Sequence, residues 1–328
     1  MAKKVAINGF GRIGRLTARF LLQDPEIEIV GINDLTDNKT LAHLFKYDTA
    51  HGKFDGEVSA DDGHIYINGQ KIKATAERNP EKLPWKKLGV ETVLEATGVF
   101  RTKEKASMHI TAGAKRVIIS APGKDAVKTI VIGVNHESLT KRSKVVSNAS
   151  CTTNCLAPMA KVLDDAFGID YGLMTTTHAY TADQNIQDAP HSDLRRARAA
   201  AENIVPTTTG AAAAVSLVLP HLKGKLDGSA IRVPTITGSL TELNAIVKKK
   251  ATVESVNKAF AKAAKGEFKG VIYFNEDPIV SSDIVGNTYS CIFDSPLTKV
   301  MNKMVRILAW YDNEAGYSKR LAELTSMF

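Results

Sequence analysis

The first third of the chain alternates between short apolar runs and stretches with helical spacing. Residues 5–7 form a short apolar run, and apolar side chains then recur at helical spacing over residues 13–21. Pro25 follows this stretch, and residues 27–32 form a second apolar run. A strand, a helix and a second strand within about 30 residues predict a β-α-β unit of a parallel sheet.

Further β-branched, apolar runs lie at residues 92–96, 116–120 and 129–132. Uninterrupted runs of this kind are typical of strands that helices cover on both faces. Residues 61–73 are expected to form a hairpin instead, because Asn68 and Gly69 make a turn pair at its centre. The pattern therefore predicts an α/β domain of the Rossmann type, with a doubly wound parallel sheet.

The pattern changes after Ser150. Residues 152–167 have the spacing of an amphipathic helix, residues 175–180 are strand-like, and residues 240–247 alternate between apolar and polar side chains. Residues 181–203 are polar and irregular. We expect a second domain of the α+β class, built on a mixed or antiparallel sheet with helices.

The last residues have the pattern of a terminal helix. The predicted organisation is a first domain over residues 1–150, a second domain over residues 151–314, and a terminal helix over residues 315–328. A length of 328 residues agrees with two domains of about 150 residues each.

Composition narrows the class of protein. The chain is 44% apolar and 24% charged, as in soluble globular proteins. Its net charge of +8 has two interpretations, a solvated lysine-rich surface or attraction of anions such as nucleotides, sugar phosphates or nucleic acid. The run of lysines at 248–250 is too short for a nucleic-acid-binding arm. Residues 204–222 lack charges, but prolines and threonines interrupt them, so no membrane segment is expected.

The three cysteines are Cys151, Cys155 and Cys291. A sparse, odd number of cysteines does not suggest a disulfide framework and favours a reducing compartment. The first residues become polar too early for the core of a signal peptide. The expected location is the cytoplasm.

A glycine-rich motif lies between the first predicted strand and helix. Gly9, Gly11 and Gly14 form a G-x-G-x-x-G pattern, and Asp34 follows about 20 residues later at the end of the second strand. The glycines permit close approach of the backbone to a pyrophosphate at the helix N-terminus. Asp34 can accept hydrogen bonds from ribose hydroxyls and would repel the additional phosphate of NADP, so NAD is expected. The alternative is a glycine turn used only for packing.

Cys151 lies at a predicted strand-to-helix junction, where the helix dipole and free N–H groups stabilise a thiolate. This placement makes it a candidate nucleophile, and a buried structural thiol is the alternative. Cys155, one turn later, is expected to be a packed or secondary thiol. No second pair of ligands accompanies the two cysteines at a zinc-like spacing, so no metal site is expected.

The whole chain resembles the glyceraldehyde-3-phosphate dehydrogenase family, of the NAD-dependent, phosphorylating kind. The similar segments are residues 7–15, 95–98, 147–158, 177–181, 193–198 and 310–314. The resemblance implies a glycolytic enzyme that oxidises D-glyceraldehyde 3-phosphate with NAD and inorganic phosphate to 1,3-bisphosphoglycerate. The expected intermediates are a thiohemiacetal and a thioester on Cys151.

The resemblance also implies roles for individual residues. His178 would be the general base and the partner of the thiolate, and Thr181 and Arg232 would bind the substrate phosphate. The residues expected to bind the attacking phosphate are Ser150, Thr152, Arg196, Thr209 and Gly210. Hydroxyls, N–H groups and a guanidinium are suitable donors to phosphate. A surface ion pair is the alternative for Arg232, and an N-cap is a compatible interpretation of residues 207–209.

For the cofactor, the resemblance places Arg12 and Ile13 at the pyrophosphate and Asp34 at the adenosine ribose. Arg78 and Ser120 would lie on the adenine side. Asn313 would hold the nicotinamide amide, with Tyr317 nearby. Pro190 would come from a neighbouring subunit. Residues 181–203 would link the subunits of a homotetramer, with an ordinary surface loop as the alternative.

Two other functions remain open at this stage. One is oxidation of a related phosphorylated aldehyde such as erythrose 4-phosphate. The other is a partner-binding role, with RNA or at a cell surface, which the basic composition permits. Nucleic acid is expected only as a secondary partner of an enzyme.

Overall fold

The computed structural model describes residues 2–328, and the contacts within the chain divide it into two compact units. The first unit comprises the residues up to Ile130, Glu137–Ala149 and Ser318–Phe328. The second unit comprises Val131–His136 and Ser150–Tyr317. Within residues 2–328, no helix is both long enough and apolar enough to cross a membrane.

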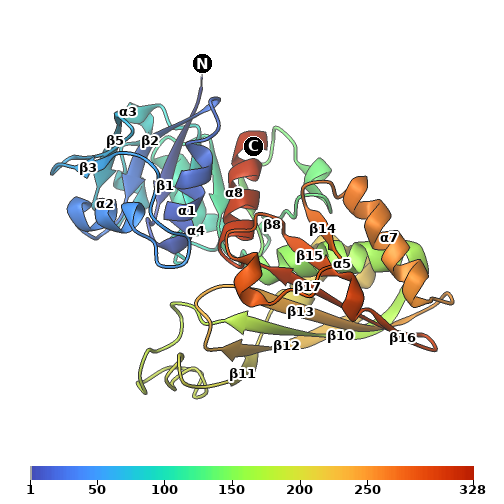
Figure 1. The fold of residues 1–328 in the computed structure, drawn as a ribbon. Helices are drawn as coiled ribbons and strands as arrows, with labels where there is room; N and C mark the ends of the chain where they lie inside the picture. Colours follow the sequence, from blue (N-terminus) through green and yellow to red (C-terminus); the bar gives the residue numbers. More distant parts are fainter. Residues whose placement is uncertain (1) are drawn as a thin grey trace. The chain divides into compact units, whose positions relative to one another are not determined.

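The first unit is built on a nine-stranded sheet with the order β3-β4-β5-β2-β1-β6-β7-β9-β8 (Figure 1). Its strands are β1 (Lys3–Asn8), β2 (Ile27–Asn33), β3 (Val58–Ala60), β4 (His64–Ile67), β5 (Gln70–Thr75), β6 (Thr92–Glu95), β7 (Arg116–Ile119), β8 (Lys128–Thr129) and β9 (Val145–Ser147). Its helices are α1 (Arg12–Leu21), α2 (Asn38–Lys46), α3 (Trp85–Leu88) and α4 (Lys103–Thr111). In the order of the sheet, all neighbouring strands between β5 and β8 at the edge pair in parallel, that is β5-β2-β1-β6-β7-β9-β8. This confirms the predicted doubly wound class.

The apolar runs seen in the sequence form the centre of this sheet. Val5, Ala6 and Ile7 of β1 and Val93 and Leu94 of β6 are fully buried. The predicted hairpin is also present, since β4 and β5 pair antiparallel across Asn68 and Gly69. The strand expected over residues 129–132 is only partly present. Strand β8 ends at Thr129, and Val131 already belongs to the second unit.

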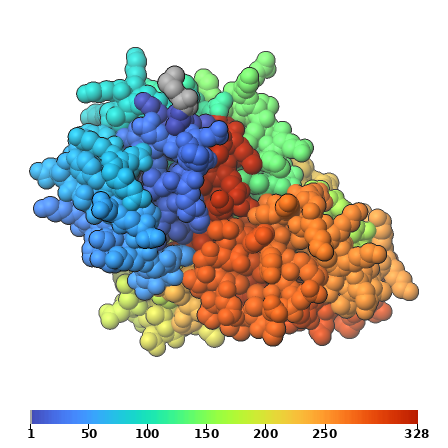
Figure 2. Space-filling model, turned by 45° about the horizontal axis from the view of Figure 1, so that its top comes forward, coloured from blue at the N-terminus to red at the C-terminus, as the bar shows by residue number. Residues whose placement is uncertain are grey.

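The C-terminal residues belong to the first unit. Helix α8 (Ala315–Met327) ends the chain, and the Lys3 ammonium donates to the carbonyl oxygens of Thr325 at 3.0 Å and Ser326 at 2.8 Å. Figure 2 shows the red C-terminal residues beside the blue residues of the N-terminal strands and helices. Both ends of the chain are therefore held in one unit.

The second unit contains a mixed sheet with the order β11-β12-β10-β13-β17-β15-β14, and β16 pairs with β17. Its strands are β10 (Ile169–Ala179), β11 (Val205–Thr208), β12 (Leu226–Val233), β13 (Ser239–Val247), β14 (Ile272–Asn275), β15 (Cys291–Asp294), β16 (Lys299–Met301) and β17 (Met304–Tyr311). The helices are α5 (Cys151–Phe167), α6 (Ala211–Val218) and α7 (Val253–Lys265). This arrangement confirms the expected mixed sheet with helices.

One face of the mixed sheet is covered, and the other carries exposed side chains. Helix α5 contacts β10, β13, β15 and β17 and lies with α7 on one side of the sheet (Figure 1). On β10, Tyr171 and Leu173 remain 59% and 64% exposed. The strand begins at Ile169, earlier than the predicted residue 175. The sequence did not indicate this first part, because its apolar side chains lie on both faces of the strand and so do not alternate with polar ones.

Strand β1 lies between β2 and β6, so the chain leaves β1 at the point where the strand order reverses. Ligands of doubly wound sheets bind at such a point, beyond the carboxyl ends of the strands. The glycine turn begins here with Gly9, whose φ is +92°. A Cβ on Gly14 would lie 2.2 Å from the Gly9 carbonyl oxygen, so helix α1 can pack on the turn only with glycine at this position.

Replacing Gly14 by alanine is expected to destabilise the protein by about 1–3 kcal/mol, because the new methyl group meets backbone that cannot move aside. Gly11→Ala is the matched control, since no described atom lies within 4 Å of its Cβ position. Thermal unfolding of both variants beside the parent protein would check this. Equal midpoints for the two variants would contradict the packing role of Gly14.

Candidate active site

The candidate nucleophile opens the longest helix of the second unit. Helix α5 begins at Cys151, and the Ser150 hydroxyl caps it by accepting from the Thr153 N–H at 3.0 Å. The preceding Ala149 is buried with φ +57°, a left-handed conformation that costs a non-glycine residue about 1–2 kcal/mol. The backbone therefore makes a strained turn into the helix, and Cys151 lies where the helix N-terminus favours negative charge.

His178, near the end of β10, contacts the Cys151 thiol. The distance between Sγ and the imidazole Nε2 is 3.3 Å. The other ring nitrogen, Nδ1, lies 2.7 Å from the Ala179 carbonyl oxygen, which can only accept a hydrogen bond. The Arg232 Nη1 also lies 3.1 Å from Nδ1, but the carbonyl contact is the shorter of the two, so we assign the proton of the neutral ring to Nδ1, which leaves the lone pair of Nε2 toward the thiol.

Tyr311, on β17, fixes the surroundings of this pair. Its ring lies edge-on to the His178 ring, with centroids 6.0 Å apart. Its buried hydroxyl lies 2.9 Å from the Thr152 hydroxyl and 2.8 Å from the Thr176 hydroxyl. We assigned no role to Tyr311 from the sequence. Its position two residues before Asn313 in the 310–314 segment is the signal that could have indicated it.

Burial determines the charge state of the pair. It lowers the pKa of His178 to about 3, and the nearby Arg232 guanidinium acts in the same direction. Burial also raises the pKa of the Cys151 thiol, while Arg232 and hydrogen bonds at Thr152 oppose that shift. Burial thus disfavours a positive charge on His178 alone and a negative charge on Cys151 alone. Transfer of the proton from Sγ to Nε2 leaves the total charge unchanged and places opposite charges side by side.

Arg232 is brought to this pair by sheet register. In the parallel pairing of β10 with β12, Arg232 lies opposite His178. Its Nη1 donates to the Thr181 hydroxyl and to the Ala179 carbonyl, each at 3.1 Å. Its Nε is buried and has no hydrogen-bond partner within residues 2–328. A partly buried guanidinium with an unused donor beside a threonine hydroxyl is a suitable partner for a phosphate group.

A second group of anion-binding candidates lies around Arg196. The guanidinium pairs with Asp183 at 2.6 Å and donates to the Thr207 hydroxyl at 2.9 Å and to the Thr208 carbonyl at 3.2 Å. Asp183 also accepts from the Thr181 hydroxyl, so it links the two groups of candidates. Sequence reasoning did not select Asp183, which lies among the polar residues of the 181–203 stretch.

The segment after β11 leads into α6 with Gly210 as its N-cap. The Thr209 hydroxyl, one residue before this N-cap, accepts from the Ala211 N–H at 3.2 Å, and α6 has no side-chain cap, so the N-cap position falls on Gly210 and outside residues 207–209. The Thr152 hydroxyl is buried against Tyr311. Of the residues expected at the attacking phosphate, Thr209 and Gly210 thus lie at one helix N-terminus, and Ser150 and Thr152 lie at the N-terminus of α5.

The cofactor candidates of the first unit lie at the carboxyl edge of its sheet. Helix α1 begins at Arg12, so the backbone N–H groups of Arg12 and Ile13 belong to its first turn. The side chain of Arg12 is directed to Asp48, with 3.1 Å between Nη2 and Oδ1. Asp34 accepts from the Phe10 N–H at 2.8 Å, which places its carboxylate beside the glycine turn.

Arg78 and Ser120 complete the candidates of the first unit. Arg78 is exposed beyond β5. Ser120 directly follows β7, and its N–H donates to the Glu95 carbonyl at 2.9 Å. Both therefore follow strands whose carboxyl ends share the edge that also carries Asp34.

The other cofactor candidates belong to the second unit. Asn313 is buried, and its Oδ1 accepts from the Gly238 N–H at 3.1 Å and from the Ser239 hydroxyl at 2.8 Å. Two donors fix the orientation of the amide, which leaves its NH₂ group to donate elsewhere. Tyr317 is buried near the start of α8, and Pro190 is exposed.

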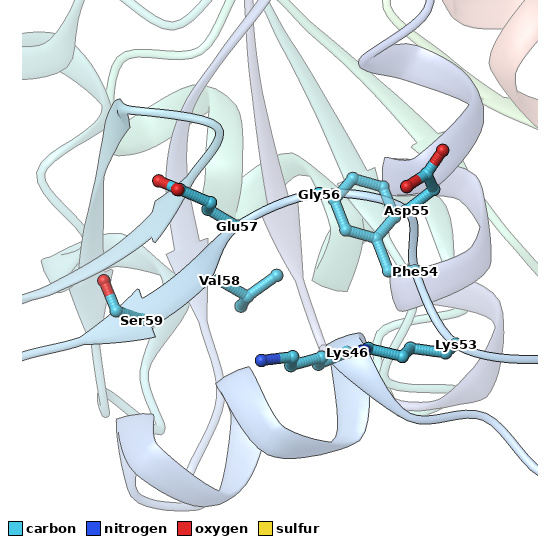
Figure 3. A pocket seen from close by; sticks show the side chains of 8 residues that line it. All are labelled: Lys46, Lys53, Phe54, Asp55, Gly56, Glu57, Val58 and Ser59. Atoms are coloured by element: carbon cyan, nitrogen blue, oxygen red, sulfur yellow. The ribbon is translucent and has the colours of Figure 1, made fainter.

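One hollow of the first unit lies away from these residues and has a volume of about 600 Å³. Figure 3 shows the side chains that line it, among them Lys46 and Phe54. Its lining combines two lysines with acidic and small side chains from residues 53–59, and none of these is a predicted site residue.

The Rossmann-type sheet of the first unit is typical of dehydrogenases that use a nicotinamide cofactor, and the second unit holds a cysteine–histidine pair with partly buried guanidinium groups nearby. Family models extend this conclusion. Residues 3–103 match the NAD binding domain of glyceraldehyde 3-phosphate dehydrogenase, and residues 150–313 match the C-terminal domain of the same family.

Curated relatives agree over nearly the full length. Glyceraldehyde-3-phosphate dehydrogenase of Streptomyces coelicolor is 59% identical, over 99% of this chain and 98% of the relative. The enzymes of Geobacillus stearothermophilus and Clostridium acetobutylicum are 56% and 55% identical over the same shares. The chain belongs to the glyceraldehyde-3-phosphate dehydrogenase family and is an NAD-dependent oxidoreductase of glycolysis. The relatives do not favour the erythrose 4-phosphate or partner-binding alternatives.

The replacement His178→Asn is expected to make Cys151 less reactive near neutral pH. Without the imidazole, the proton has no acceptor, and burial then holds the thiol pKa above its usual value. The thiolate fraction near pH 7 falls, and alkylation by iodoacetamide becomes about tenfold slower for each unit of pKa increase. The rate recovers only at more alkaline pH.

The pH profile of alkylation, measured without substrate, would check this expectation. His221→Asn is the matched control, since His221 is an exposed surface residue that pairs with Asp164. An unchanged pH profile in the His178 variant would show that the imidazole does not govern the thiol.

Proposed function

We propose that Cys151 and His178 catalyse the phosphorylating oxidation of D-glyceraldehyde 3-phosphate to 1,3-bisphosphoglycerate. The observation that carries this proposal is the 3.3 Å contact between the Cys151 Sγ and the Nε2 of His178. A thiol needs a neighbouring base to act as a nucleophile at neutral pH, and this contact supplies one.

His178 accepts a proton twice in the proposed reaction, first from the Cys151 thiol and later from the hydroxyl of the intermediate. His178 accepts the thiol proton, and the Cys151 sulfur adds to the aldehyde carbon. The proton then passes from Nε2 to the new oxygen and gives a thiohemiacetal. NAD, when bound, supplies the hydride acceptor. His178 takes the hydroxyl proton as the C–H bond breaks, and a thioester remains on Cys151.

Inorganic phosphate then attacks the thioester carbon, and the sulfur leaves as a thiolate. The product is an acyl phosphate. His178, which holds the proton from the oxidation step, then returns it to the Cys151 thiolate. We assign Thr181 and Arg232 to the phosphate of the substrate, because the unused Nε of Arg232 lies near the reacting pair. Ser150, Thr152, Arg196, Thr209 and Gly210 are assigned to the attacking phosphate. Their hydroxyls, guanidinium and helix N-termini are suitable donors.

For the cofactor, the backbone N–H groups of Arg12 and Ile13 at the N-terminus of α1 fit a pyrophosphate. Asp34 fits the ribose hydroxyls, and the NH₂ group of Asn313 fits the carboxamide oxygen of the nicotinamide. Gly9, Gly11 and Gly14 shape the turn, and Arg78, Ser120, Tyr317 and Pro190 complete the set by family resemblance.

We assign residues 1–150 to cofactor binding, residues 151–314 to catalysis, and residues 315–328 to a helix that returns to the first domain. The clustering of Ser318–Phe328 with the N-terminal residues supports the last assignment. Because Cys151 must remain a free thiol, a reducing compartment such as the cytoplasm is the proposed location.

A homotetramer is proposed as the working form. The uncovered face of the mixed sheet supports it, with Tyr171 and Leu173 exposed on β10 and Met304 exposed on β17. A largely apolar hollow of about 450 Å³ lies on this face. An exposed apolar face of this kind marks a site of association, and a second copy of the same face is the occupant proposed here. Exposed Ile186 and Leu194 in the 181–203 stretch supply further apolar surface.

The central test is NADH formation from glyceraldehyde 3-phosphate and NAD, with and without inorganic phosphate. Rapid turnover is expected only with phosphate, because the thioester must be cleaved by a second anion. Cys151→Ser is expected to lose turnover while it still binds NAD in a calorimetric titration. Phosphorylating activity retained in this variant would overturn the assignment of the nucleophile.

Association is tested by Leu173→Glu, which places a charge on the exposed face of β10. A shift from a tetramer toward smaller species is expected in sedimentation velocity, because a buried unpaired charge opposes association. Met327→Glu, which alters a side chain of similar exposure on α8, is the matched control. An unchanged assembly in the Leu173 variant would show that this face is not an interface.

A further inference from the structure

A fully buried polar network lies at the carboxyl ends of β1 and β6. Glu95 ends β6 and is 1% exposed, and Asn8 ends β1 directly opposite it in the sheet register. Neither residue has a part in the reaction described above. A buried carboxylate is costly unless several donors satisfy it, so its position requires an explanation.

Glu95 accepts hydrogen bonds from three segments of the first unit. Its Oε2 accepts from the Asn8 amide at 2.6 Å and from the His109 Nε2 at 2.9 Å. Its Oε1 accepts from the Thr97 N–H at 2.9 Å and also from the Thr97 hydroxyl. The carboxylate therefore joins the end of β1, the loop after β6 and helix α4.

His109 holds the carboxylate in place. The ring is fully buried, and its Nδ1 accepts from the Trp85 indole N–H at 3.0 Å. An indole nitrogen can only donate, so the ring proton is assigned to Nε2, which donates to Glu95. Both ring nitrogens are thus committed, and the histidine orients Glu95 as a fixed donor.

The network continues to the strands on the other side of β1. The Asn33 amide, at the end of β2, donates to the Asn8 Oδ1 at 2.7 Å. The Asn33 Oδ1 accepts from the Thr75 hydroxyl at 2.8 Å and from the Glu77 N–H at 2.9 Å. Side chains therefore tie together the carboxyl ends of β6, β1, β2 and β5.

The cofactor-binding candidates follow directly on these residues. The glycine turn begins one residue after Asn8, and Asp34 follows Asn33. The turn also touches the loop after β6, since a Cβ on Gly9 would lie 2.7 Å from the Thr97 backbone nitrogen. A displacement of the Glu95 carboxylate would consequently move both loops at the edge where the nucleotide binds.

We propose that Glu95 is a positioning residue for NAD. Its carboxylate fixes the loop of residues 96–98 against the glycine turn, and His109 sets the orientation of the carboxylate. The proposal rests on the NAD-binding function of the first unit. It concerns how firmly the cofactor is bound and leaves the chemistry at Cys151 unchanged.

The test is Glu95→Gln, which keeps the size of the side chain but replaces one oxygen by an NH₂ group. In one orientation the NH₂ group faces the Asn8 amide and the His109 Nε2, and in the other it faces the Thr97 N–H. The donors on that side then have no acceptor. The Kd of NAD in calorimetric titration and the KM of NAD are expected to rise about tenfold or more, the value of a lost charge-assisted hydrogen bond.

The readouts separate positioning from general instability. The kcat value is expected to stay within about twofold, and the KM values of the aldehyde and of phosphate are expected to be unchanged. A merely structural defect would reduce the amount of active enzyme without a selective rise in the KM of NAD. Thr92→Val is the matched control, because Thr92 is equally buried at the other end of β6 and its hydroxyl has no partner in the described chain.

An NAD Kd within twofold of the parent value in folded Glu95→Gln would overturn the proposal. If that variant does not fold, His109→Gln and His109→Leu replace it. The glutamine can keep a donor toward Glu95 and is expected to bind NAD more tightly than the leucine variant. Equal NAD affinity in both, at the parent value, would also overturn the proposal. Absence of NAD binding in the parent protein would instead refute the assigned cofactor.

Discussion

The contact between the Cys151 thiol and the His178 imidazole is the interaction on which the proposed chemistry of the second unit depends. A proton moves between the two groups only if their separation is held near the observed 3.3 Å. That requirement explains why both groups lie on regular elements. The Ser150 cap fixes the start of α5, and the sheet register fixes the end of β10 beside Arg232. Catalytic groups on rigid elements are positioned more exactly than groups on loops.

The parts of the site that follow from local sequence could be predicted, and those made by distant segments could not. The glycine turn and Asp34 belong to one β-α-β unit, so spacing alone brought them together. The roles of His178 and Arg232 came from the family resemblance. Tyr311 contacts Thr176 across a sequence separation of 135 residues, and no local pattern carries that information. The same holds for Asp183, whose partner Arg196 lies across an irregular loop.

The fold was predictable where one type of periodicity dominated. The buried strands of the first unit appear as apolar runs, and α5 appears as an amphipathic helix. The start of β10 was missed because Ile169 is buried while Tyr171 and Leu173 are exposed, so apolar side chains occupy both faces. A strand loses its alternation when its outer face is apolar. The failure of prediction there has the same physical cause as the proposed association through that face.

Two buried histidines show how a hydrogen-bond partner selects the function of the same side chain. At His178, a backbone carbonyl accepts a hydrogen bond from Nδ1–H in the assigned tautomer, so Nε2 is an acceptor, as the proposed role of a base toward Cys151 requires. At His109, the Trp85 indole donates to Nδ1, so Nε2 carries the proton and can only donate to Glu95. Burial removes water as an alternative partner in both cases. The first arrangement leaves a proton free to move during the reaction, whereas the second fixes a proton and with it the position of a carboxylate.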